Sequence, residues 1–222
     1  GNQSAYRSWN WKRHAGFDVV NYIGNNSSHN EISHSLGKTP EMLWIKARNR
    51  SAVWVVYHKG LNGGTNPNTY NLQLNGAGAE GAWNWSDNTP PTSTHFTVSS
   101  GASINFQENY LALLFASVEG ISKVGSYTGS SYALTITTGF SPRFVIIKNR
   151  TNTGNNWTTG WFTFDTARGW AAGNNDKRMR LNDNAAETTE DWTDPISTGF
   201  TINANSGNQL NNNGEGYIYY AH

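Results

Sequence analysis

Two stretches of the chain carry an unbroken apolar run between a proline and a charged end. Residues 40–48 read PEMLWIKAR, and residues 142–150 read PRFVIIKNR. Proline cannot donate a ladder hydrogen bond and therefore suits the start of a strand, and four apolar residues in succession leave neither face polar. Each stretch predicts a strand that is buried on both faces and runs out to a charged surface. Because Lys148 follows Lys46 by 102 positions in a matched context, the pattern also predicts that the chain is built twice.

The match continues on both sides of these strands. The further matched segments are 19–24 with 124–129, 32–36 with 136–140, 54–57 with 161–164, 72–75 with 179–182, 79–80 with 186–187, 85–87 with 192–194, 96–98 with 200–202, and 110–112 with 217–219. Solenoid and propeller units repeat at roughly 20–50 residues, so a period near 100 predicts that each copy is a domain. We expect an N-terminal arm at 1–16, a first copy at 17–119 and a second copy at 120–222.

The hydrophobic pattern within each copy predicts strands and no helices. Short apolar segments alternate with loops rich in Asn and Gly, which accommodate tight turns. Residues 109–118 are apolar throughout, but their counterpart, residues 217–220, is strongly strand-forming, which favours a strand in both copies. The expected fold class is all-β, with two tandem β-sandwich domains of the jelly-roll or concanavalin-like type. Gly120 alone separates them, so we expect them to pack side by side.

The composition narrows the range of partners. The net charge is +1 and only 14% of the residues are charged, so there is no electrostatic reason to expect nucleic acid as a partner. No run approaches the roughly 20 apolar residues of a membrane span, so we expect no membrane insertion. The chain has no cysteine, which excludes disulfides and thiolate metal sites. The 10 Trp, 10 Tyr and 9 Phe predict an aromatic core.

Both ends of the chain suggest a longer parent protein. The sequence opens at Gly1 without an initiator Met, and the last strand is still running at His222. The arm carries Trp9, Trp11 and basic residues without periodicity. Such a mixture can stack on a base or a sugar, but packing of the arm against its neighbour is the interpretation we prefer.

Motifs for catalysis and metal binding are missing from the sequence. There is no nucleophile elbow, phosphate-binding glycine loop, zinc-protease helix or calcium loop. The histidines are scattered, and although His29 and His34 have a spacing that can hold a metal, we interpret them as solvated side chains. We therefore expect no metal site and no cofactor.

Paired carboxylates are the remaining route to an enzyme. Glycoside hydrolysis needs two acids about 5–10 Å apart, and Asp165, Asp176 and Asp183 could converge in the second copy. However, the first copy has His58 in the region that matches Asp165, and acids kept by both copies, such as Glu80 and Glu187, are explained by the shared fold. We expect the protein not to be an enzyme.

Comparison of the two copies also divides the tryptophans into predicted core residues and candidate binding residues. Trp54 and Trp85 match Trp161 and Trp192, and Trp44 matches an isoleucine, so these five are predicted to lie in the core. Three others have no counterpart and lie beside polar loops, namely Trp83, Trp157 and Trp170. An aromatic ring in such a loop offers an apolar face to a sugar, so these three are the candidate glycan-stacking residues. The alternative is that each closes the edge of its own sandwich or contacts a neighbouring chain.

Several segments resemble a known family. They are residues 17–25 (FDVVNYIGN), 32–42 (ISHSLGKTPEM), 56–61 (VYHKGL), 110–116 (YLALLFA) and 125–129 (GSYTG). Together they resemble a duplicated domain of structural and tail-fibre proteins of tailed bacteriophages, especially marine ones, whose function is uncertain. The resemblance implies a virion component such as a fibre, knob or adhesin on the extracellular face of the particle. Its expected partners are a host-surface glycan, other virion proteins and further copies of itself in a homo-oligomer.

Three functions are therefore open at this point. The first is a non-enzymatic module that binds carbohydrate, the second a polysaccharide-degrading depolymerase, and the third a purely architectural or capsid-decorating domain. We take the first as the working hypothesis.

Overall fold

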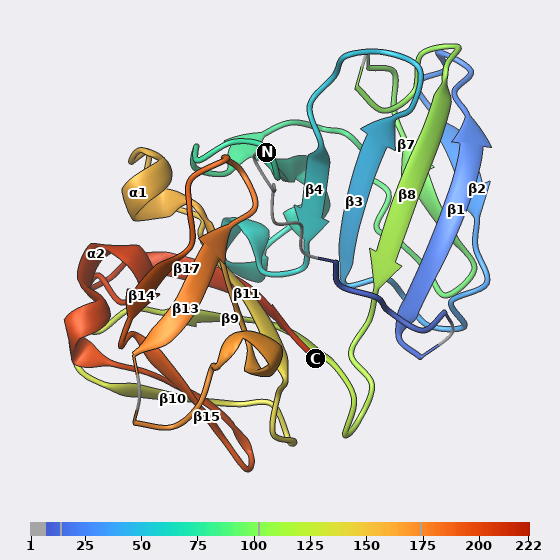
Figure 1. Cartoon of the computed structure of the whole chain (residues 1–222). Coiled ribbons are helices and arrows are strands. Elements are labelled where there is room, and N and C mark those ends of the chain that lie inside the picture. Colours follow the sequence, from blue (N-terminus) through green and yellow to red (C-terminus); the bar gives the residue numbers. More distant parts are fainter. Residues whose placement is uncertain (1–7, 14, 102, 174) are drawn as a thin grey trace, which may run out of the picture.

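The computed structural model describes residues 8–13, 15–101, 103–173 and 175–222, and its fold is all-β with antiparallel sheets (Figure 1). The strands before residue 120 are β1 (Phe17–Ile23), β2 (Asn30–Ser33), β3 (Met42–Ala47), β4 (Val55–His58), β5 (Tyr70–Gln73), β6 (Gly81–Ala82), β7 (His95–Val98) and β8 (Asn109–Phe115). Those after it are β9 (Lys123–Thr128), β10 (Leu134–Thr137), β11 (Phe144–Asn149), β12 (Trp161–Asp165), β13 (Asp176–Arg180), β14 (Thr188–Glu190), β15 (Thr193–Ile196), β16 (Gly199–Ile202) and β17 (Gly216–Ala221).

Each half of the chain builds one six-stranded sheet and one small sheet. The first large sheet has the order β1-β8-β3-β4-β5-β6, and the second has the order β9-β17-β11-β12-β13-β14. Their registers also correspond, since Val56 pairs with Leu72 in the first sheet and Thr163 pairs with Met179 in the second. The small sheets are β2-β7 and β10-β16-β15. The two large sheets therefore arrange their strands in the same order along the chain, whereas the small sheets differ by the strand β15.

The unbroken apolar strands β3 and β11 are buried on both faces, as the sequence predicts, but the charged end predicted for β11 does not lie at the surface, because Lys148 is fully buried. Alternate residues of a strand point to opposite faces. Leu43 and Ile45 of β3 pack inside the first half, and Val145 and Ile147 of β11 pack inside the second. The intervening residues, Met42, Trp44, Phe144 and Ile146, belong to a third cluster that contains residues of both halves. The second face of each large sheet is thus covered around its central strand by the other half, and we call this third cluster the shared core.

Polar contacts reinforce the shared core at its margin. The indole N–H of Trp161 donates to the Gln73 carbonyl oxygen at 2.9 Å, and the Lys148 ammonium donates to the Ala77 carbonyl oxygen at 3.1 Å. The Nε2 atom of the fully buried His58 lies 3.2 Å from the Tyr219 carbonyl oxygen. Burial lowers the pKa of His58 to about 4, so its ring is neutral at pH 7.

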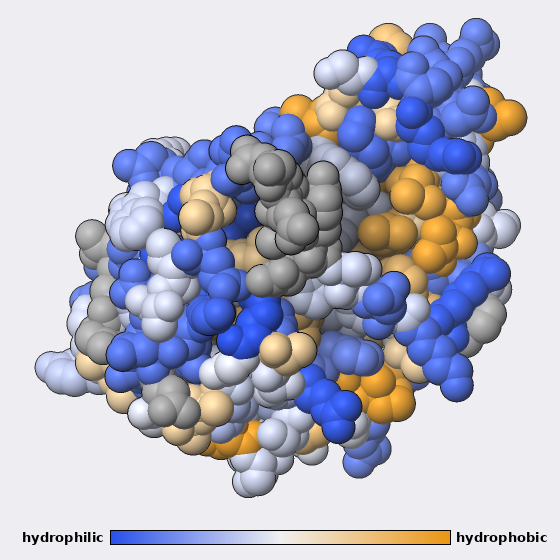
Figure 2. Space-filling model, in the orientation of Figure 1, coloured by the Kyte–Doolittle hydropathy of each residue, from blue (hydrophilic) through white to orange (hydrophobic). Residues whose placement is uncertain are grey.

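Part of the outer face of the first large sheet remains at the surface. Hydrophobic side chains gather on the right of the molecule (Figure 2), in the region where Figure 1 places β3, β8 and β1. Val19 of β1 and Leu113 of β8 are half-buried. The rest of the visible face is mainly hydrophilic, which agrees with a surface rich in neutral polar residues.

The arm packs across the junction of the two halves, which confirms the interpretation of its aromatic residues. The ring of Trp11 lies 5.7 Å from Phe17 and 5.9 Å from Phe144, and the ring of Trp9 lies 5.6 Å from Phe144. Residues 1–7 and 14 of the predicted arm fall outside the described residues.

The strand at residues 109–118 is confirmed by β8, but the absence of helices is not. The described part of the chain contains two single-turn helices, α1 (Asn156–Thr159) and α2 (Gly207–Leu210), and four short 3₁₀ segments, η1 (Leu61–Gly64), η2 (Pro67–Thr69), η3 (Thr166–Arg168) and η4 (Ala204–Ser206). One turn is too short to produce a hydrophobic period in the sequence. In the described residues no helix is long and apolar enough to cross a membrane.

Candidate functional site

The three candidate tryptophans lie in three different settings. Trp170 is only 1% exposed, and its indole N–H donates to the Thr193 carbonyl oxygen at 2.8 Å. Trp83 is half-buried and packs against the core of the first half, with its ring beside Gly101. Trp157 is 47% exposed. A ring must reach solvent to stack on a sugar, so we leave Trp170 out of the candidate site and centre it on Trp157.

Trp157 lies on a segment that the first half does not have. The spacing between matched residues grows from 102 positions at Lys148 to 107 at Trp161, so the second half has extra residues between them. These residues include α1, which lies at the outer edge of the molecule (Figure 1). The Asn155 side chain accepts hydrogen bonds from the backbone N–H groups of Trp157 and Thr158, which is the usual cap of a helix N-terminus. The insertion is therefore an ordered turn that presents Trp157.

The ring of Trp157 covers two arginines of β13. The guanidinium carbon of Arg178 lies 4.8 Å from the ring centroid and that of Arg180 lies 5.2 Å from it. Arg178 is enclosed further by Trp192 at 4.2 Å and Phe162 at 5.2 Å. Its side chain is 1% exposed and forms an ion pair with Glu190 at 3.4 Å. Burial lowers the pKa of Arg178, but Arg remains charged, so the aromatic rings stabilise a buried cation.

Arg180, which contacts the Trp157 ring, is held by a carboxylate. Arg180 forms an ion pair with Asp183, with 2.7 Å between Nε and Oδ2. The Asn182 side-chain oxygen accepts from the Trp161 backbone N–H at 2.8 Å, while its Nδ2 has no partner within the described chain. An aromatic surface beside a guanidinium group and its carboxylate partner can stack on the C–H groups of a sugar and hydrogen-bond to its hydroxyls.

The three candidate acids are each held by different partners. Asp165 accepts from Arg168 Nε at 2.5 Å, and Asp183 is paired with Arg180. Asp176 is fully buried and accepts from the Ala171 N–H at 3.0 Å. Burial, aided by the neighbouring charges of Asp194 and Asp191, raises the pKa of Asp176 to about 6. Each of the three carboxylates therefore has a partner of its own.

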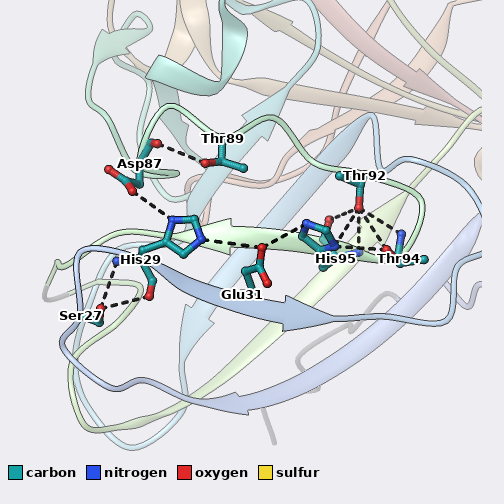
Figure 3. Close-up of polar contacts among 8 residues, drawn as sticks. All are labelled: Ser27, His29, Glu31, Asp87, Thr89, Thr92, Thr94 and His95. Carbon is teal, nitrogen blue, oxygen red and sulfur yellow. Dashed lines mark hydrogen bonds and ion pairs between the residues drawn. The ribbon is translucent and has the colours of Figure 1, made fainter.

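Histidines that are distant in the sequence meet on the small sheet of the first half (Figure 3). His29 Nδ1 lies 3.0 Å from Asp87 Oδ2, and the Nε2 atoms of His29 and His95 lie 3.7 and 3.5 Å from the same oxygen of Glu31. His29 and His34 do not share a site, because His34 Nε2 contacts the Thr92 carbonyl oxygen at 3.2 Å. These histidines contact carboxylate or carbonyl oxygens, a feature that their sequence spacing did not reveal. Across the described ranges, no group of three or more His, Asp or Glu side chains is placed to hold a metal ion.

The comparisons with known proteins give a family and no characterised relative. A family model whose description is "Domain of unknown function (DUF7483)" matches residues 1–222. Neither the curated proteins nor the solved structures include a match to the chain.

Proposed function

The chain belongs to the DUF7483 family of domains of unknown function, and we propose that it is a non-enzymatic, carbohydrate-binding module of a phage virion. In this proposal Trp157 is the stacking surface for a glycan of the host cell. The observation that supports it most strongly is the 47% exposure of a tryptophan on an ordered insertion that occurs in one half only. Exposure of the apolar indole surface to water is unfavourable, and a sugar that stacks on the ring removes this surface from water.

We also infer that the two halves are copies of one β-sandwich of the jelly-roll type. The common strand order supports this inference, and so do details that repeat. Tyr22 stacks on Tyr110 at 5.1 Å and 15°, and Tyr127 stacks on Tyr217 at 4.9 Å and 6°. The hydroxyls of Tyr22 and Tyr127 donate to the carbonyl oxygens of Ile104 and Leu210, respectively. We attribute the features that both copies share to the stability of the fold. We assign ligand recognition to the segments in which the copies differ.

The virion context rests on the motifs that resemble phage tail-fibre proteins. A fibre or adhesin on the outside of the particle would meet host glycans directly. Other virion proteins and further copies of this chain are the proposed protein partners. The depolymerase alternative requires two acids around one glycosidic bond, and the architectural alternative requires Trp157 to be covered by a neighbouring chain in the assembled particle.

Glycan binding by the whole chain tests the proposal. The protein is applied to an array of bacterial capsular polysaccharides and lipopolysaccharide O-chains, and each polysaccharide that binds is then assayed for release of reducing ends. Binding without release supports the module, and release would establish the depolymerase. If no polysaccharide binds, the proposed function is wrong and the architectural role takes its place.

A further inference from the structure

A hollow of about 350 Å³ lies between the arm and the second half, on a part of the molecule that the Trp157 site does not use. Its lining residues are Ser8, Trp9, Asp165, Ala167, Arg168 and Lys177. This volume falls at the lower end of the range for small-molecule sites. The hollow is therefore large enough for one small polar molecule.

The end of β12 borders this hollow because the first half does not cover it. Asp165 pairs with Phe144 in the second sheet, and His58 pairs with Met42 at the matching place in the first. His58 is enclosed between the halves, where it meets the Tyr219 carbonyl oxygen. Asp165 instead accepts a hydrogen bond from the Trp9 indole N–H at 3.2 Å. The arm thus forms one wall, and the second half forms the other.

The wall built around Arg168 is held rigidly. Arg168 Nε donates to Asp165 at 2.5 Å, one terminal nitrogen donates to Glu187 at 3.1 Å, and the other donates to the Thr163 carbonyl oxygen at 3.2 Å. The Arg168 side chain is only 7% exposed. Such a network fixes the geometry of the hollow before any ligand arrives, which lowers the ordering cost of binding.

Lys177 provides donors for a ligand. Its ammonium lies 3.3 Å from Glu187, and its side chain is 54% exposed. An ammonium has three N–H donors, so a contact with one carboxylate oxygen leaves capacity for further acceptors. Among the charged residues that line the hollow, Arg168 and Lys177 are cations and Asp165 is an anion. Glu187 pairs with both cations and so brings the local charges into balance. The Lys177 side chain is 54% exposed, whereas those of Glu187 and Asp165 are 22% and 8% exposed, so the ammonium is the charge that a ligand meets first, and it favours a negatively charged group.

Trp9 adds an aromatic wall. Its ring is half-buried and lies 5.6 Å from Phe144, with the Arg168 guanidinium carbon 5.8 Å from its centroid. An aromatic wall, a fixed polar wall and a cation at the mouth suit a ring with apolar C–H groups, several hydroxyls and a carboxylate.

We propose that this hollow binds a single acidic sugar unit of the uronic acid class, with its ring against Trp9 and its carboxylate at Lys177. This inference rests on the proposed function in one respect, namely that the ligand is a sugar. Its residues are distinct from Trp157, so each site can fail without the other.

Glucuronate, glucose and inorganic sulfate are the probes for the test, and binding to the whole chain is measured by saturation-transfer NMR and calorimetry. Ala167→Trp fills the hollow from an exposed position and removes no hydrogen bond, and Thr166→Trp, at the adjacent exposed position, is its matched control. We expect glucuronate to bind the wild type and Thr166→Trp equally, and to bind Ala167→Trp at least about tenfold more weakly. Lys177→Gln should reduce the preference for glucuronate over glucose, and Trp157→Ala should leave glucuronate binding unchanged.

Four results would overturn the inference. They are undetectable glucuronate binding by the wild type, equal binding by Ala167→Trp, glucose binding as tight as that of glucuronate, and displacement of glucuronate by an equal concentration of sulfate. The last would identify a general anion site. Loss of glucuronate binding in Trp157→Ala but not in Ala167→Trp would assign the acidic sugar to the Trp157 site and contradict the inference while supporting the proposed function.

Discussion

The ring of Trp157 lies 4.8 Å from the guanidinium carbon of Arg178, a cation whose side chain is 1% exposed. This contact gives Trp157 a structural role in addition to the binding role proposed for it. Part of the indole shields the buried charge of Arg178, and the rest of it is exposed to solvent. A loss of binding in a Trp157 variant must therefore be separated from a loss of stability.

Trp157→Ala should lower the free energy of unfolding by about 1 kcal/mol, because it removes a cation–π contact with a largely desolvated arginine. Trp157→Phe keeps an aromatic ring and should lose about half as much. Urea denaturation provides the measurement, with Tyr132→Ala as the control, since Tyr132 is 78% exposed and its loss should cost less than about 0.5 kcal/mol. Equal stability of Trp157→Ala and wild type would show that the contact with Arg178 contributes nothing to the free energy of unfolding.

The shared core should make the two halves unfold together. A single calorimetric transition is expected, with equal calorimetric and van't Hoff enthalpies, because exposing either large sheet would expose the apolar face of the other. Trp161→Phe should cost about 1 kcal/mol through the lost hydrogen bond to Gln73, whereas Trp54→Phe at the matched, half-buried position should cost less. Two resolved transitions would mean that the halves are independent.

Asp176 should penalise the folded state at neutral pH. Its pKa rises from 3.8 to about 6, mainly through burial, so the folded protein holds this proton more tightly than the unfolded chain does. The penalty is absent below about pH 4, grows between pH 4 and 6 and is complete above pH 6. Asp176→Asn should therefore stabilise the protein by about 2 kcal/mol at pH 7, with the difference disappearing near pH 4 in urea titrations. A less stable Asn variant at pH 7 would show that the ionised carboxylate is needed.

His58 should act in the opposite sense. Its pKa falls from 6.5 to about 4, mainly through burial, so the unfolded chain takes up a proton that the folded protein excludes. The contribution of the neutral ring is complete above pH 6.5 and is lost as the pH falls toward 4. Between pH 6.5 and 4.5 the wild type should lose about 2 kcal/mol more stability than His58→Gln, whose amide can also donate and accept. Parallel pH profiles for the two proteins would contradict the assignment of His58 as a buried neutral side chain.

The sequence was sufficient to predict the strands that matter most for the architecture. An apolar run such as residues 42–45 cannot leave either face in water, and in the structure both faces of β3 are covered. Four of the five tryptophans matched as core residues are at most 6% exposed, while Trp54 is half-buried. Both features depend on the local pattern of apolar residues and on composition, so they can be predicted without a structure.

The polar interior could not be predicted in the same way. Arg178 lies among charged residues in β13, a pattern typical of a solvated strand, and only three-dimensional packing shows that aromatic rings from distant segments enclose it. Trp170 lies in a polar loop, yet its ring turns into the core of the second half. His29 and His95 meet at Glu31 because β2 and β7 are neighbours, and their separation in the sequence gives no sign of this contact.

Calorimetric titration of a polysaccharide identified on the array into wild type, Trp157→Ala, Trp157→Phe and Tyr132→Ala tests the central claim most directly. The account predicts that Trp157→Ala weakens binding at least about tenfold at a temperature where circular dichroism shows every protein folded. Trp157→Phe should retain intermediate affinity, and Tyr132→Ala should match the wild type. Wild-type affinity in Trp157→Ala would contradict the claim that this tryptophan is the recognition surface.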